Sequence, residues 1–129
     1  MKNTLKITMD LDGVLFNFSK KYGEIINQVL GPNTVPEGFD APSDWDWTDH
    51  VPKDRVDDLW KVINATEDFW LTIEPHYENC AALYRFIVDH PEVEVHYVTA
   101  RAETAGQPLV TQISQSLGRI GLLRENTTI

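Results

Sequence analysis

Two aspartates, Asp10 and Asp12, follow a segment near the N-terminus in which apolar and polar residues alternate, with apolar residues at Leu5, Ile7, Met9 and Leu11. Alternation with a period of two predicts a β-strand that runs into the two acids. Carboxylates two residues apart on a strand point the same way, about 6.6–6.8 Å apart. If one attacks phosphorus and the other moves a proton, the pair is suited to phosphoryl transfer. Mg²⁺ would offset their repulsion from a phosphate dianion.

Asp-x-Asp-Gly has two other interpretations. A turn with two solvated carboxylates remains open for so short a motif. A calcium-binding EF-hand loop is excluded, because its sixth position would be Leu15 instead of glycine and its twelfth Lys21 instead of glutamate. The context favours a site, since a second predicted strand, residues 93–99, ends at the hydroxyl residue Thr99.

Further along the chain, apolar spacing predicts helices over residues 19–30, 53–64, 78–90 and, more weakly, 107–117. Ser19 is the expected N-cap of the first helix, and Gly31-Pro32 is its stop signal. Residues 33–52 form an aromatic, proline-rich excursion of the kind that often acts as a lid. Residues 126–129 open a possible third strand. Strands that alternate with helices predict a parallel sheet with right-handed crossovers.

The composition narrows the class of protein. Its 129 residues suit one domain, and a net charge of −9 disfavours a broad nucleic-acid-binding face. The single cysteine, Cys80, allows neither an intrachain disulfide nor a zinc cluster of thiolates. Because no apolar run approaches the roughly 18 residues of a membrane span, we expect a soluble cytoplasmic protein without a membrane partner.

The motifs resemble those of the haloacid dehalogenase (HAD) superfamily. Residues 9–15, Met-Asp-Leu-Asp-Gly-Val-Leu, are similar to its first motif, and residues 95–101, Val-His-Tyr-Val-Thr-Ala-Arg, to its second. Residues 68–75, Asp-Phe-Trp-Leu-Thr-Ile-Glu-Pro, resemble the 5′(3′)-deoxyribonucleotidase branch. The resemblance implies a HAD-like (Rossmannoid) three-layer α/β fold, shortened at its C-terminus. It divides the single domain into a core, about residues 1–18 and 76–129, and a small helical cap, about residues 19–75.

The same resemblance implies a Mg²⁺-dependent phosphomonoester hydrolase that acts on nucleoside monophosphates through an aspartyl-phosphate intermediate. Asp10 would be the nucleophile and a metal ligand. Asp12 would be the general acid/base and would lend its backbone carbonyl to the metal. Thr99 would hydrogen-bond a phosphate oxygen.

Three more residues are candidates for substrate contact. Arg101 could add positive charge, although an exposed arginine at the start of a loop is an equal alternative. Phe18 could cover a base or sugar, with core packing as the alternative, and Trp47 could form a stacking wall over the pocket.

Two parts that the resemblance implies are absent from the sequence. No lysine follows Arg101 to serve as the third motif, and the only later acids, Glu103 and Glu125, do not form the pair of the fourth. Three explanations stay open: a shortened form of an active enzyme, a chain with weak activity, and a HAD-like domain used for binding or regulation. A half-site protein that another chain completes is a further possibility. The oligomeric state is left undetermined.

Overall fold

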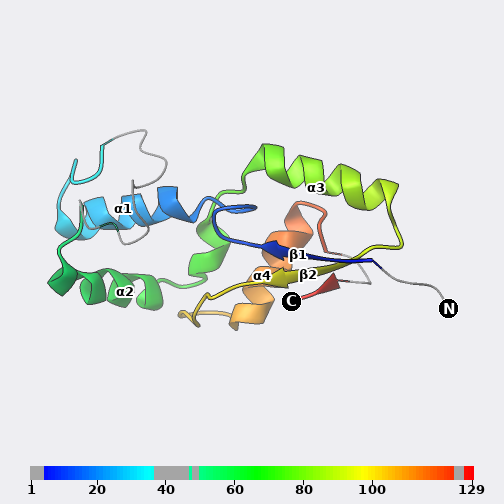
Figure 1. The fold of residues 1–129 in the computed structure, drawn as a ribbon. Coiled ribbons are helices and arrows are strands. Elements are labelled where there is room, and N and C mark those ends of the chain that lie inside the picture. The colour runs from blue at the N-terminus through cyan, green and yellow to red at the C-terminus, as the bar shows by residue number, and fades with distance from the viewer. Residues whose placement is uncertain (1–4, 37–46, 48–49, 124–126) are drawn as a thin grey trace.

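The computed structural model describes residues 5–36, 47, 50–123 and 127–129. Strands and helices alternate along the chain, as the sequence predicts (Figure 1). In chain order the elements are β1 (Lys6–Asp10), α1 (Phe18–Leu30), η1 (Lys53–Arg55), α2 (Val56–Ala65), η2 (Phe69–Thr72), α3 (Tyr77–Asp89), β2 (Glu94–Val98), α4 (Leu109–Arg119) and β3 (Thr127–Thr128). No helix among the described residues is long and apolar enough to cross a membrane.

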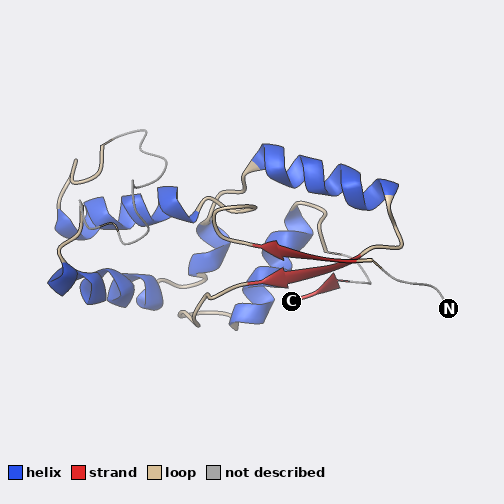
Figure 2. Cartoon of the chain, in the orientation of Figure 1, coloured by secondary structure: helices blue, strands red, loops and turns tan. Residues whose placement is uncertain are grey.

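The three strands form one parallel sheet in the order β1-β2-β3, which confirms the predicted parallel arrangement. Asp10 at the end of β1 is paired with Val98 at the end of β2. Figure 2 shows both strands pointing toward the end of the molecule where α1 and α2 lie. The carboxyl ends of β1 and β2 therefore meet at one edge, the position at which α/β sheets bind ligands.

The sheet is covered on one face within the described part of the chain. Val95 and Tyr97 are buried, at 0% and 2% exposure, whereas Lys6, Thr8 and Asp10 on the other face are exposed. Both crossovers advance in the same direction across the sheet, and right-handed crossovers then place α3 and α4 on the same face. The described residues thus form two layers, and the third layer of the expected HAD-like fold is not among them.

The α1–α2 pair is inserted between β1 and α3. The chain leaves toward the pair through residues 15–17 and returns through residues 74–76, and these two segments run side by side. The Asn17 amide donates to the Glu74 carbonyl, and the His76 amide donates to the Leu15 carbonyl, each at 2.8 Å. This short double connection joins the helical pair to the sheet at the carboxyl end of β1 (Figure 1).

Helix α1 begins one residue earlier than predicted. Its N-cap is Asn17, not Ser19, because the Asn17 side-chain oxygen accepts a hydrogen bond from the Lys20 amide at 3.1 Å. The predicted stop is confirmed, since Gly31 ends the helix with φ +121°. Of the predicted lid, residues 37–46 and 48–49 lie outside the described residues.

Candidate functional site

Strand β1 ends at Asp10, and a tight turn follows. The amides of Leu15 and Phe16 both donate to the carbonyl of the fully buried Leu11, each at 2.9 Å, and Gly13 adopts φ +82°. Asp12 therefore lies in the turn. The expectation that both carboxylates project from one strand is wrong, because the buried Leu11 anchors the chain where the turn begins.

Asp12 is paired with Arg101, which follows β2. Arg101 Nη2 donates to Asp12 Oδ1 at 2.8 Å, and Arg101 Nε lies 3.1 Å from Oδ2 and 3.3 Å from Oδ1. The Arg101 side chain is 1% exposed, and the Asp12 side chain 28%. The guanidinium therefore binds the carboxylate from the protein interior, and part of the carboxylate stays exposed to solvent.

Two aromatic rings hold the Arg101 guanidinium. Its central carbon lies 4.7 Å from the Trp70 ring centroid and 5.3 Å from that of Phe16. Nη1 is buried and has no hydrogen-bond partner among the described contacts. The alternative of an exposed loop arginine is wrong, since this side chain belongs to the interior of the site.

Thr99 directly follows the residue that pairs with Asp10, so it lies at the same edge of the sheet. Its Oγ1 accepts a hydrogen bond from the Arg101 amide at 3.0 Å, while the residue itself is exposed. The hydroxyl hydrogen remains able to donate to an oxygen atom of a ligand. The structure thus gathers Thr99, Arg101 and Asp12 beside the end of β1.

The two aromatic candidates for substrate contact pack within the protein. Phe18 is half-buried, and its ring centroid lies 5.4 Å from that of Tyr22 and 5.9 Å from that of Trp70. Trp47 is 6% exposed and meets Tyr22 edge-on at 5.1 Å. Phe18 contacts Trp70, whose ring lies against the Arg101 guanidinium, whereas Trp47 contacts Tyr22, which in turn contacts Phe18.

A buried amide that sequence reasoning missed, Gln112, braces the loop after Arg101. Its Oε1 accepts from the Trp70 amide at 2.9 Å, and its Nε2 donates to the Gln107 carbonyl at 2.8 Å. The Trp70 indole donates to the Ala102 carbonyl at 2.8 Å. The only signal in the sequence is a glutamine at a position that the helical period of α4 assigns to the buried face, next to Ile113.

A second interaction, centred on Asp68, fixes the same loop. Asp68 Oδ1 accepts from the Gln107 amide at 2.8 Å, and the Asp68 amide donates to the Ala105 carbonyl at 2.9 Å. Asp68 directly precedes η2, so the return from the helical pair and the loop that carries Arg101 are tied together. The ring of Trp70 is held over the guanidinium by these contacts.

The oxygen donors at the end of β1 suit a metal ion whose remaining ligands are water molecules and the substrate. Among the described residues, no group of three or more His, Cys, Asp or Glu side chains could hold a metal ion. Asp10 offers an exposed carboxylate and Asp12 a main-chain carbonyl, whereas the Asp12 carboxylate is engaged by Arg101. Mg²⁺ usually binds through one or two carboxylates, substrate phosphates and water. The donor set therefore fits Mg²⁺ in the presence of a phosphate.

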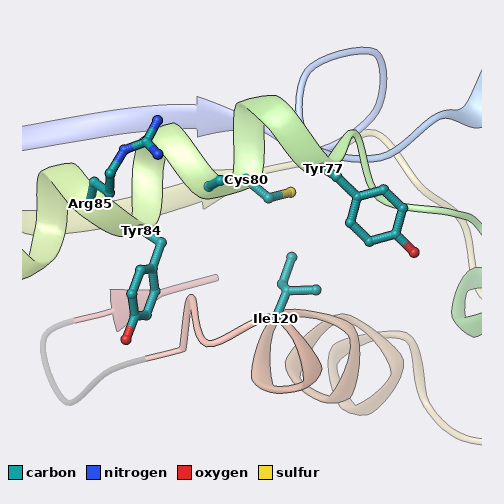
Figure 3. Close-up of a pocket in the computed structure, with 6 residues that line it drawn as sticks. Tyr77, Cys80, Tyr84, Arg85 and Ile120 are labelled. Carbon is teal, nitrogen blue, oxygen red and sulfur yellow. The ribbon is translucent and has the colours of Figure 1, made fainter.

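An apolar groove between α3 and Ile120, at the end of α4, is a separate feature. It encloses about 460 Å³ and is lined by Tyr77, Cys80, Tyr84 and Ile120, among others (Figure 3). The Cys80 thiol donates to the Leu15 carbonyl at 3.3 Å, and burial raises its pKa. Such a thiol is a poor nucleophile at neutral pH, so the groove offers packing surface without reactive chemistry.

Comparison with known protein families gives a match that covers most of the chain. A family model described as 5′ nucleotidase, deoxy (pyrimidine), cytosolic type C protein matches residues 3–115, which span β1, the helical pair, β2 and the buried Arg101. No curated protein and no solved structure matches the chain.

Proposed function

Because the chain belongs to the family of 5′ nucleotidase, deoxy (pyrimidine), cytosolic type C proteins, which are HAD-type nucleotidases, we propose that it is a Mg²⁺-dependent phosphomonoester hydrolase. Its substrates are nucleoside monophosphates, deoxyribonucleotides among them, and its location is the cytoplasm. The observation that supports the proposal is that the paired parallel strands β1 and β2 end side by side at Asp10 and Val98, and that Arg101 links the residues that follow them, Asp12 and Thr99.

In the first step an Asp10 carboxylate oxygen attacks phosphorus, and the bond from phosphorus to the nucleoside oxygen breaks. Asp12 gives a proton to the departing oxygen, and Thr99 donates a hydrogen bond to an equatorial phosphate oxygen. In the second step water attacks the phosphorus of the aspartyl phosphate, Asp12 takes its proton, and Asp10 and inorganic phosphate are released. Asp10 and the Asp12 carbonyl would hold Mg²⁺, which supplies positive charge to the phosphate when bound.

The other three candidates for substrate contact are Phe18, Trp47 and Arg101. Phe18 is half-buried and Trp47 is buried, and both rings pack against Tyr22, so we assign neither to the base or sugar. Arg101 is aimed at Asp12, which supports a role that acts through that carboxylate.

The test is release of phosphate from a panel of deoxynucleoside monophosphates by the 129-residue chain, with Mg²⁺ and with a chelator. We expect Mg²⁺-dependent release that Asp10→Asn abolishes while the circular-dichroism spectrum stays unchanged, because the nearly isosteric amide cannot act as an anionic nucleophile. Turnover that survives Asp10→Asn would refute the covalent mechanism. Absence of turnover in the parent chain would instead favour a HAD-like domain used for binding.

A further inference from the structure

From the geometry around Asp12 we infer that Arg101 is a positioning residue that fixes the Asp12 carboxylate for the second half of the reaction, in which water attacks the aspartyl phosphate. The inference rests on the proposed function and deepens it, because it states which atom of Asp12 accepts the proton. It also explains why an arginine is kept almost wholly inside the protein, at 1% side-chain exposure.

The pattern of contacts selects one oxygen of Asp12. Oδ1 receives hydrogen bonds from both Nη2, at 2.8 Å, and Nε, at 3.3 Å, whereas Oδ2 receives one from Nε, at 3.1 Å. Nε has a single hydrogen, which its two contacts share, so Oδ1 accepts one full hydrogen bond and a share of a second, whereas Oδ2 accepts only a share of one. Since the Asp12 side chain is 28% exposed, water can reach this carboxylate. Oδ2 is therefore the atom that takes the proton from the attacking water.

The surroundings of Arg101 keep this geometry rigid. A guanidinium donates in a fixed plane, and this one lies against the rings of Trp70 and Phe16. Trp70 is itself held through its amide by Gln112 and through its indole by the Ala102 carbonyl. The carboxylate thus cannot turn about its χ2 angle without breaking bonds to a side chain that has no room to follow.

A contribution to fold stability does not by itself explain why Arg101 is buried. Its Nη1 is buried and unpartnered in the described part of the chain, and burying a donor without a partner is costly. Buried ion pairs can often be replaced by apolar residues with little loss of stability. A residue that breaks these rules beside catalytic groups is explained by what it does for them.

The balanced step is as follows. The water oxygen forms a bond to phosphorus, the bond between phosphorus and the Asp10 carboxylate oxygen breaks, and one water proton moves to Asp12 Oδ2. Inorganic phosphate leaves, and the carboxylate of Asp10 is regenerated. Arg101 transfers nothing in this step and touches neither the phosphate nor the water.

The two halves of the reaction can be separated with p-nitrophenyl phosphate. Its leaving group, p-nitrophenolate, departs without a proton, so the first step needs Asp10 but not Asp12. The second step still needs Asp12 as a base. Rapid mixing then reports a burst of p-nitrophenolate for the first step and a steady phase for the second.

The informative variants are Arg101→Met, which keeps the length of the side chain without its charge, and Arg101→Lys, which keeps a point charge without the planar fork. We expect the burst rate constant of Arg101→Met to stay within about threefold of the parent. Its steady phase should fall on the order of 10- to 100-fold, within the range that general-base catalysis contributes. Arg101→Lys should lie between the two. The matched control is Arg85→Met, because Arg85 is exposed on α3, and it should change neither phase.

Each other outcome overturns the inference in a distinguishable way. Equal loss in both phases, in either Arg101 variant, means that the arginine only supports the structure of the site. Unchanged kinetics means that Asp12 needs no partner. If Arg101→Met does not fold by circular dichroism, Arg101→Lys decides between these results. Absence of turnover in the parent chain contradicts the proposed function itself, and the positioning role falls with it.

Discussion

Gly106, in the loop after Arg101, packs against the segment before η2, and its replacement by alanine tests that contact. Its φ is +92°, in the region that side chains avoid. A Cβ there would overlap Asp68 Oδ1, and it would lie 2.8 Å from the Asp68 amide nitrogen and 2.9 Å from Glu67 Cγ. Backbone on both sides must shift to accept it.

The expected cost has two parts. The left-handed backbone costs a residue with a Cβ about 1–2 kcal/mol. Displacement of Asp68 also weakens its bond to the Gln107 amide, which contributes about 1 kcal/mol. Gly106→Ala should therefore lower the free energy of unfolding by about 2–3 kcal/mol. Urea unfolding followed by tryptophan fluorescence measures this difference.

Gly118 offers a matched control in the last turn of α4. A Cβ at Gly118 would meet no atom within 4 Å, and its backbone is helical. Gly118→Ala should raise the free energy of unfolding by up to about 1 kcal/mol, because alanine favours the helix. Equal stability of Gly106→Ala and the parent would refute the close contact with Asp68 and the brace that depends on it.

Two further outcomes follow from buried groups. Gln112→Leu should lower the free energy of unfolding by about 2–4 kcal/mol, because the Trp70 backbone amide loses its hydrogen-bond partner. Gln115 is exposed, so Gln115→Leu should change this free energy by less than about 0.5 kcal/mol. Urea titration of both variants tests this, and similar losses in the two would contradict it. Burial raises the pKa of the Cys80 thiol and of the Tyr22 phenol above their ordinary values of 9.0 and 10.0. As the pH rises, the unfolded chain releases these protons before the folded chain does. The two groups therefore contribute fully to the free energy of unfolding below pH 9.0, and this free energy should fall above it, less steeply in Tyr22→Phe. A free energy of unfolding that stays constant up to about pH 11 would contradict this.

The sequence predicts the elements better than the contacts between them. Periodicity and stop signals identify β1, β2 and the helices, because these patterns are local. Local patterns do not predict the turn at Asp12, because the buried position of Leu11, where the turn begins, depends on the packed core. Asn17 is the N-cap in place of Ser19 because of another contact that is distant in sequence. The Asn17 backbone amide donates to the Glu74 carbonyl of the returning chain.

For the candidate site too, the sequence predicts the positions of single residues better than the contacts between them. The motifs place Asp10 and Thr99 at strand ends, and the parallel register brings those ends together. The pairing of Asp12 with Arg101 joins residues 89 positions apart and needs the rings of two further segments around the guanidinium. No periodicity encodes such an arrangement, so an acid and an arginine after neighbouring strands gave only a hint of it.

The position of β1 at the border of the described sheet has a consequence for handling the protein. Among the described residues β1 is hydrogen-bonded to β2 alone, so its other side presents backbone amides and carbonyls that a strand from another copy can pair with. The exposed Lys6 and Asp10 side chains and the net charge of −9 oppose such pairing. Dissolved salt screens charge beyond about 8 Å at physiological ionic strength. Concentrated stocks should therefore remain monodisperse in dilute buffer and self-associate as salt is added.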